Sequence, residues 1–354
     1  MFPDDTIFML RCFDLARLGL GNVKQNPLVG SVITHKGRII GEGYHAVYGQ
    51  AHAEVNAIHS VKERDRVYLR EATIYVSLEP CFHFGKTPPC VDLILQEGIP
   101  RVVIACVDPN PKVAGKSIEK LRCAGVEVVT GVLAQYGKSL IRAFIKNMEQ
   151  SKPYVILKWS QSNDGFIGNP DRRVLISNSY IQRLVHKWRF ESDAILVGTN
   201  TVLIDNPRLD TRAYFGQAPI RIAFDRWGTI PRNYHILDDN IQTIIFNDHG
   251  EALEGDWTRT RFLPLGGSLD SMLSELYSLG IGTLFVEGGA GVLGSFIESG
   301  DWDEARVIEG LGLLGSGVTA PLLRDAELIE SYSIEGDLVS IYSRIKLPNI
   351  TKEH

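Results

Sequence analysis

The sequence lacks the long hydrophobic runs, internal repeats and low-complexity tracts that mark membrane and fibrous proteins. No apolar stretch among its 354 residues approaches the ~20 residues that a membrane-spanning helix needs. The opening residues, Met1 to Asp5, lack the basic segment with which a signal peptide begins. With 44% hydrophobic and 22% charged residues, the composition is that of an ordinary globular protein. We therefore expect a soluble, cytoplasmic protein with no membrane partner.

Cysteine is scarce, and neither sign of charge dominates the chain as a whole. The five cysteines are odd in number and irregular in spacing, so roles in the core or in metal binding are favoured over a disulfide framework. Residues 1–148 contain 18 Lys and Arg against 14 Asp and Glu, whereas residues 149–354 contain 19 against 28. An acidic second half is poorly suited to a nucleic-acid backbone. We expect no nucleic-acid partner, while the mildly basic first half leaves room for a small anionic substrate.

The length and the order of predicted elements favour two domains, over residues 1–148 and 149–354, joined near Ser151-Lys152-Pro153. Strands alternate with helices in the first part, which predicts a sheet with helices on both faces. Helices are predicted over residues 6–19 (capped by Thr6), 51–62, 90–97 and 115–124, and strands over 29–34, 38–44, 73–78, 101–107 and 126–131. A second series of strands is predicted over residues 154–159, 194–198, 220–225, 243–247 and 283–287.

One histidine and two cysteines in the first part have the chemistry of a zinc site. His52 stands at the start of a predicted helix, Cys81 follows a predicted strand, and Cys90 opens the next helix. Three such ligands leave a fourth position for water, which distinguishes a catalytic zinc site from a closed structural one. Bound zinc lowers the pKa of that water to ~7 and so supplies hydroxide at neutral pH. Glu54, two residues from His52, is placed to move protons, as in nucleobase deaminases.

Each of these features is weak by itself. A lone His-x-Glu pair occurs by chance on many helices, and isolated cysteines are more often buried thiols than ligands. The spacing between Cys81 and Cys90 is also longer than the Cys-x-x-Cys that is common in zinc deaminases. The order of the residues, their placement between strand and helix, and the presence of Glu54 together favour catalytic zinc.

The segment from Glu79 to Cys90 (Glu-Pro-Cys-Phe-His-Phe-Gly-Lys-Thr-Pro-Pro-Cys) resembles the zinc segment of the bifunctional deaminase/reductase family of riboflavin biosynthesis, in which the longer spacing is usual. Residues 26–30, 41–45 and 108–116 resemble other deaminase motifs of that family. The resemblance implies a cytidine-deaminase-like three-layer α/β/α domain that binds Zn²⁺. It also implies a phosphorylated substrate, 2,5-diamino-6-(5-phosphoribosylamino)pyrimidin-4(3H)-one. The residues that it places around this substrate are Asn26, His45, His83, Lys86 and Thr87.

The second part has a glycine-rich turn, Gly288 to Gly294, between a predicted strand and a predicted helix. Such a turn suits phosphate binding, but by itself it is most often only a tight turn. Residues 176–178, 185–189, 193–202 and 205–212 resemble the reductase domain of the same family, which implies a dihydrofolate-reductase-like α/β fold and the cofactor NADPH. The cofactor residues implied are Ser160, Leu175, Thr201, Asp205, Gly289, Ala290, Gly291, Val292, Leu293, Gly294 and Ser295, and the substrate residues are Arg173, Arg189, Leu209, Arg212 and Glu287.

The chain departs from the family pattern at a few positions. Ser31 stands where the family tends to have Cys or Ala, and Ser117 where it usually has Gly. Asn163 and Phe166 alter a Ser-Leu-Asp-Gly-Lys motif. Leu175 replaces an aromatic residue, so an aromatic face against the cofactor is expected to be absent.

Two other functions remain as alternatives. One is a tRNA or cytidine deaminase with an unrelated or repurposed second domain. The other is a zinc-stabilised binding protein without activity, against which Glu54 argues because a structural site has no need of it. The expected partner is the small phosphorylated pyrimidine, and both a monomer and a homo-oligomer are compatible with the sequence.

Overall fold

The structure is a computed structural model, and it describes residues 5–82, 88–110, 114–248, 258–264 and 267–345. Within these ranges, none of the helices is long and apolar enough to cross a lipid bilayer. The chain divides into two compact units, Met1–Ser151 and Lys152–His354. The division falls just after helix α6 (Arg142–Gln150), so the predicted boundary after residue 148 would cut that helix before its last turn is complete.

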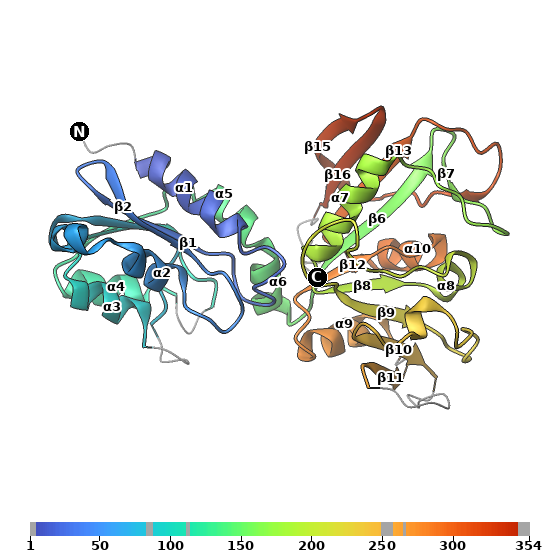
Figure 1. The fold of residues 1–354 in the computed structure, drawn as a ribbon, viewed down its shortest axis with the longest axis horizontal. Coiled ribbons are helices and arrows are strands. Elements are labelled where there is room, and N and C mark those ends of the chain that lie inside the picture. The colour runs from blue at the N-terminus through green and yellow to red at the C-terminus, as the bar shows by residue number, and fades with distance from the viewer. Residues whose placement is uncertain (1–4, 83–87, 111–113, 249–257, 265–266, 346–354) are drawn as a thin grey trace, which may run out of the picture. The chain divides into compact units, whose positions relative to one another are not determined.

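The N-terminal unit is a three-layer α/β/α sandwich around a five-stranded sheet in the order β2-β1-β3-β4-β5 (Figure 1). The strands are β1 (Gly30–His35), β2 (Arg38–Tyr44), β3 (Thr73–Leu78), β4 (Arg101–Cys106) and β5 (Glu127–Thr130). Strands β3, β4 and β5 are parallel, and β1 is antiparallel to both β2 and β3. The hairpin between β1 and β2 turns through Lys36 and Gly37, both with positive φ, which is the geometry of a two-residue type I′ turn.

Helices cover both faces of this sheet, and each face has its own apolar core. They are α1 (Asp5–Arg17), α2 (Ala53–Ser60), the 3-10 helix η1 (Glu63–Glu71), α3 (Cys90–Glu97), α4 (Lys116–Cys123), α5 (Ala134–Leu140) and α6. One core joins α1 and α5 to the sheet, and the other joins α2, α3 and α4 to the opposite face. Helix α1 already begins at Asp5, so Thr6 lies inside the helix and the predicted cap at Thr6 is wrong.

The C-terminal unit is built on a nine-stranded sheet in the order β11-β10-β9-β8-β12-β6-β13-β16-β15. Pairing is parallel from β11 to β13 and antiparallel between β13, β16 and β15. These strands are β6 (Tyr154–Ser162), β8 (Ala194–Val197), β9 (Ile220–Phe224), β10 (Thr243–Asn247), β11 (Thr260–Pro264), β12 (Thr283–Val286), β13 (Glu304–Gly310), β15 (Ala326–Ile334) and β16 (Asp337–Arg344). A small separate sheet pairs β7 (Phe166–Gly168) with β14 (Val318–Thr319).

The helices of this unit connect the parallel strands. They are α7 (Ser179–Phe190), α8 (Thr199–Asp205), the 3-10 helix η2 (His235–Leu237), α9 (Leu269–Ser278) and α10 (Ala290–Ser299). Helices α9 and α10 pack on one face of the sheet in a core with residues of β6, β8 and β12. Helices α8 and α10 begin directly beyond the carboxyl ends of β8 and β12, which is where open parallel sheets bind ligands.

Candidate metal centre and reductase pocket

The three side chains predicted to bind zinc lie together in the N-terminal unit. His52 directly precedes α2, Cys81 follows β3, and Cys90 is the first residue of α3. One ligand atom from each residue lies within 4.8 Å of the other two, and His52 Nδ1 is 3.4 Å from Cys90 Sγ. The contact with Cys90 lowers the pKa of the Cys81 thiol, which favours the thiolate that binds metal. Two sulfur atoms and an imidazole nitrogen at this spacing fit zinc with one position left for water.

Close packing between α2 and β2 holds His52 at this site. A Cβ placed on Gly43 would lie 2.3 Å from the Ala57 nitrogen, and one on Gly41 would lie 2.5 Å from the Ala57 carbonyl oxygen. Only glycine therefore allows this separation between helix and strand. The repeated glycines of the 41–43 motif set the depth of α2, and with it the position of His52 at the start of the helix.

Glu54 lies on the first turn of α2 and is buried beside the zinc residues. Burial, reinforced by the negative charge of Cys81, raises the pKa of Glu54 to about 7. Within the described residues, the ligand cluster consists of His52, Cys81 and Cys90, and Glu54 is not one of its members. A buried carboxyl that exchanges protons near neutral pH is suited to general acid–base catalysis.

Two of the predicted substrate residues, Asn26 and His45, stand next to His52. The rings of His45 and His52 are nearly perpendicular, with centroids 5.6 Å apart. Nδ1 of His45 donates to the Ala51 carbonyl at 3.1 Å, so Nε2 of the neutral ring accepts from Asn26 Nδ2 at 3.0 Å. Burial lowers the pKa of His45 and favours this neutral form. The other three predicted residues, His83, Lys86 and Thr87, lie outside the described part of the chain.

Glu79 is a buried carboxylate that the sequence analysis did not single out. It directly precedes the Pro80-Cys81 pair, and its two oxygens accept four hydrogen bonds from the segment that follows β4 and from the start of α4. Oε2 accepts from the backbone N–H groups of Asp108 and Gly115 at 3.2 and 3.0 Å, and Oε1 accepts from the N–H and the hydroxyl of Ser117 at 3.2 and 2.6 Å. The cap residue of α4, Gly115, has no side chain, so Glu79 satisfies the first N–H groups of that helix. Its position two residues before the predicted metal ligand Cys81 is the feature of the sequence that could have identified it.

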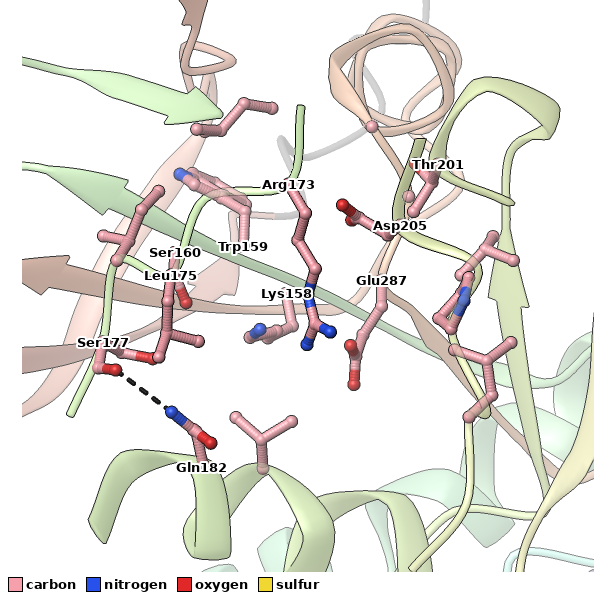
Figure 2. Close-up of a pocket in the computed structure, with 18 of the residues that line it drawn as sticks. Lys158, Trp159, Ser160, Arg173, Leu175, Ser177, Gln182, Thr201, Asp205 and Glu287 are labelled. Carbon is pink, nitrogen blue, oxygen red and sulfur yellow. Dashed lines mark hydrogen bonds between the residues drawn. The ribbon is translucent and has the colours of Figure 1, made fainter. Parts of the chain in front are cut away.

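In the C-terminal unit, two adjoining cavities of about 270 and 520 Å³ open at the carboxyl ends of β6, β8 and β12. The smaller cavity is shown in Figure 2, and the larger one lies over the starts of α8 and α10. Residues common to both are Ile167, Val174, Thr201, Asp205 and Gly289. A cofactor in the larger cavity would therefore meet a substrate in the smaller one.

Most of the predicted cofactor residues line these cavities. Ser160 and Leu175 line the smaller one, Thr201, Asp205 and Gly289 line both, and Ala290, Gly291 and Val292 line the larger one. Ala290, Gly291 and Val292 form the first turn of α10, whose N–H groups have no partner within the helix and are available to a phosphate.

The last three predicted cofactor residues do not line either cavity. The chain is already helical from Ala290, so Leu293, Gly294 and Ser295 lie on the second turn of α10 and not in a turn facing the cofactor. The Leu293 side chain is 0% exposed in the core beneath the sheet, and its N–H donates to the Gly289 carbonyl at 3.1 Å. The backbone N–H and the side chain of Leu293 are therefore both engaged within the protein, whereas Gly294 is half-buried and Ser295 is exposed. A cofactor role for these three residues stays a prediction.

All five predicted substrate residues, Arg173, Arg189, Leu209, Arg212 and Glu287, line the smaller cavity. Arg189 forms a two-point ion pair with Glu287, with Nε–Oε1 and Nη2–Oε2 distances of 2.8 Å each. Burial alone would raise the pKa of Glu287, but the charges of Arg189 and Lys158 outweigh it and hold this pKa at about 2. Most of the donor capacity of Arg189 is thus committed inside the protein. Arg212, paired with Asp210 and 52% exposed at its side chain, is more accessible to a ligand.

Lys158 and Trp159 are cavity residues that the sequence analysis missed. The Lys158 side chain forms no hydrogen bond with the described residues, and burial lowers its pKa although Glu287 acts in the opposite direction. Trp159 lines the same cavity as Leu175 (Figure 2) but not the larger cavity assigned to the cofactor, so the expected absence of an aromatic face against the cofactor stays a prediction. Its indole Nε1 donates to Gln161 Oε1 at 2.9 Å. Side chains alternate along β6, so Lys158 lies on the same face of the strand as the predicted cofactor residue Ser160. This spacing could have identified Lys158 from the sequence.

Comparisons with known proteins identify the family of each unit. Residues 3–106 match the cytidine and deoxycytidylate deaminase zinc-binding region, and residues 153–344 match the RibD C-terminal domain. The chain is 36% identical to the riboflavin biosynthesis protein RibD of Aquifex aeolicus over 93% of each chain. It is 39% identical to RibD of Bacillus amyloliquefaciens over 92% of this chain and 89% of the relative.

Solved structures show the same architecture over nearly the whole chain. The diaminohydroxyphosphoribosylaminopyrimidine deaminase/5-amino-6-(5-phosphoribosylamino)uracil reductase of Thermotoga maritima is 34% identical, with a TM-score of 0.88 over 96% of this chain and 98% of that one. RibD of Acinetobacter baumannii is 30% identical, with a TM-score of 0.84 over the same shares. The predicted fold class is confirmed, and the chain belongs to the RibD family of riboflavin biosynthesis, with a zinc-dependent deaminase and a nicotinamide-dependent reductase in one polypeptide.

Proposed function

We propose that the N-terminal unit deaminates 2,5-diamino-6-(5-phosphoribosylamino)pyrimidin-4(3H)-one at position 2. The C-terminal unit then reduces the ribosyl chain of that product with NADPH, which gives 5-amino-6-(5-phosphoribitylamino)uracil. The observation that carries the proposal is the juxtaposition of His52, Cys81 and Cys90 with a buried, non-ligating Glu54. The substrate agrees with the name of the Thermotoga maritima relative, whose structure covers both units.

In the deaminase, the zinc ion that these three residues would hold lowers the pKa of a water molecule to ~7 and so supplies the nucleophile. Glu54 accepts the proton of that water and passes protons to a ring nitrogen and to the departing amino group. The C–N bond at position 2 breaks, ammonia leaves, and the carbon becomes a carbonyl. Asn26, whose Nδ2 is held by His45, offers an amide to the edge of the pyrimidine ring.

In the reductase, NADPH supplies a hydride to the first carbon of the ribosyl group. The products then require one proton, on the oxygen that leaves this carbon when the sugar ring opens. Lys158 is suited to supply it, because it lines the substrate cavity and burial lowers its pKa. The Arg189–Glu287 pair gives the wall beside Lys158 a fixed geometry. The cytoplasmic location remains an expectation, and both a monomer and a homo-oligomer remain compatible with the sequence.

The test is to incubate the purified protein with the diaminopyrimidine phosphate, with and without NADPH, and to identify the products by mass. We expect release of ammonia without NADPH and the ribityl product with it, and NADH should replace NADPH poorly. Removal of zinc with a chelator should stop ammonia release but not the reduction of added deaminated intermediate. No ammonia from the zinc-loaded protein would contradict the deaminase assignment.

Arg212 allows a sharper test of the phosphate site. We expect Arg212→Ala to raise the KM for the phosphorylated intermediate about tenfold, because a charged hydrogen bond contributes ~1.5–3 kcal/mol. Wild type and variant should converge on the dephosphorylated intermediate. Arg189→Ala should instead impair the reductase on both substrates, because it leaves the buried Glu287 carboxylate without its partner. Equal losses for Arg212→Ala on both substrates would rule out Arg212 as a phosphate ligand.

A further inference from the structure

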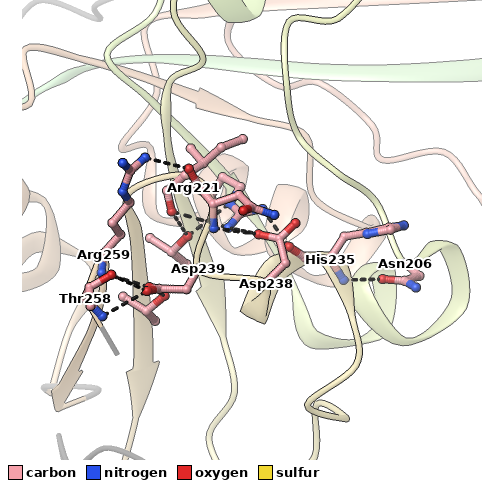
Figure 3. A network of polar contacts seen from close by, with 11 residues as sticks. Asn206, Arg221, His235, Asp238, Asp239, Thr258 and Arg259 are labelled. Carbon is pink, nitrogen blue, oxygen red and sulfur yellow. Dashed lines mark hydrogen bonds and ion pairs between the residues drawn. The ribbon is translucent and has the colours of Figure 1, made fainter. Parts of the chain in front are cut away.

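Asn206 ends the short helix that carries two cofactor-facing residues, Thr201 and Asp205. It is the C-terminal cap of α8, and its φ of 42° lies in the left-handed region that asparagine and glycine tolerate best. Its side-chain Oδ1 accepts the backbone N–H of His235 at 2.8 Å, as Figure 3 shows. Asn206 does not appear among the described lining residues of either cavity, so its side chain acts on the protein and not on a ligand.

His235 is in turn held by a guanidinium that is completely buried. Arg221, in β9, is 0% exposed, and its Nη1 donates to the His235 carbonyl at 2.6 Å. Its Nε donates to Thr243 Oγ1 at 3.0 Å, and its Nη2 donates to Asp238 Oδ1 at 2.9 Å. Because the buried cation is paired and hydrogen-bonded in several directions, the segment around His235 is a rigid anchor.

Helix α8 depends on such an anchor. It has seven residues, which is too short for a helix to be stable by itself, and Val202 is its one buried residue. Polar contacts fix both ends: Thr199 Oγ1 donates to the Phe224 carbonyl at 2.8 Å, and Tyr234 Oη donates to the Leu203 carbonyl at 3.3 Å. The contact between Asn206 and His235 is the one that lies next to Asp205.

We propose that Asn206 is a positioning residue of the reductase, which ties the cofactor helix α8 through His235 to the buried Arg221. The proposal rests on the proposed function, in which NADPH lies against Thr201 and Asp205. It assigns to Asn206 a role in cofactor affinity without contact with the cofactor. The loss of its side chain removes the contact next to Asp205 and leaves the last turn of α8 held by the contact between Tyr234 and Leu203, so that Asp205 is less firmly placed.

Two substitutions separate the side-chain contact from the backbone conformation. Asn206→Gly keeps the left-handed conformation but removes the acceptor, whereas Asn206→Asp keeps an acceptor oxygen in place. Asp239→Gly is the matched control, because Asp239 also has a positive φ (52°) and lies in the same network. The Asp239 carboxylate binds Thr258, Arg259 and Thr260 at the side of β11, away from α8.

The experiment measures the Kd for NADPH from the fluorescence of the bound cofactor in the full chain, well below the melting temperature of each variant. We expect Asn206→Gly to raise this Kd at least fivefold, Asn206→Asp to stay within about threefold of wild type, and Asp239→Gly to stay within twofold. The rate of ammonia release should be the same in all four proteins. Unchanged Kd in Asn206→Gly, or an equal rise in Asp239→Gly, would overturn the inference. A wild-type protein that does not bind NADPH would instead overturn the proposed cofactor.

Discussion

Glu54 and His52 are two residues apart at the start of α2, yet we propose different roles for them, His52 as a zinc ligand and Glu54 as the proton carrier. His52 belongs to the ligand cluster, whereas Glu54 is buried beside it with a pKa raised by burial. We expect Glu54→Gln to reduce ammonia release ~10²–10⁴-fold, because a general acid–base group contributes about that much to the rate.

Zinc content, measured by metal analysis, should stay near one ion per chain in this variant. Reduction of added intermediate should be unchanged, because the reductase site is built entirely from the other unit. His52→Ala is the control, and it should lose both zinc and ammonia release. Loss of zinc from Glu54→Gln would show that Glu54 is a ligand.

Ser31 is a second residue at which a single side-chain group, its hydroxyl, is expected to affect the stability of the fold. Its hydroxyl is fully buried in β1 and has no hydrogen-bond partner among the described residues. A buried hydroxyl without a partner costs stability, so Ser31→Ala should raise the free energy of unfolding by ~1 kcal/mol. Ser77→Ala is the matched control, because Ser77 Oγ accepts the Gly30 N–H at 3.0 Å and its loss should lower stability. Urea denaturation of both variants checks the sign, and destabilisation by Ser31→Ala would contradict the prediction.

At the scale of elements, the zinc segment and helix α4 are joined by Glu79. Its carboxylate accepts four hydrogen bonds, two of them from Ser117, where the family usually has glycine. In Glu79→Gln one oxygen becomes an NH₂ group that faces N–H donors. We expect the unfolding free energy of the N-terminal unit to fall by ~1–3 kcal/mol, because buried donors are left without an acceptor.

Ammonia release by Glu79→Gln should fall together with the stability of the N-terminal unit. The reductase activity of the same chain serves as an internal control. Ser117→Ala removes only one of the four donors, so its effect should be smaller than that of Glu79→Gln. Thermal denaturation together with the two activity assays measures these effects. A Glu79→Gln protein that resembles wild type in stability would show that the carboxylate is not needed to hold the loop.

At the scale of the whole molecule, the two units have separate sheets and separate cores. Each is long enough to bury a core of its own. We expect residues 1–151 alone to keep zinc and to release ammonia from the substrate at the rate of the full chain. A fragment that ends at residue 148 lacks the end of α6 and should be less stable. Circular dichroism, metal analysis and the ammonia assay check both fragments, and a zinc-free 1–151 fragment would contradict independent folding.

The local sequence was sufficient to predict the bounds of helices and strands that have a regular pattern of buried residues. Strand β3 (Thr73–Leu78) and helix α3 (Cys90–Glu97) were predicted with the bounds that the structure shows. Strand β15 was missed, because the segment from Ala326 to Ile334 mixes polar and apolar residues and is mostly exposed. This strand forms through pairing with β16, and a partner strand cannot be recognised from composition alone.

The sequence by itself determined the family, and it predicted the cluster of His52, Cys81 and Cys90 with Glu54 outside it, because residue type and order along the chain are enough to indicate that chemistry. Only the tertiary structure decided how the donors of the C-terminal unit are used. Arg189 and Glu287 are 98 positions apart, and folding joins them into an ion pair that commits a guanidinium expected to face the substrate. Leu293 is turned into the core because α10 begins at Ala290, and each residue of a helix rotates the side chain by about 100°. Spacing along the chain does not determine where a helix starts or which distant charges form an ion pair. Both depend on how the elements pack in the folded protein.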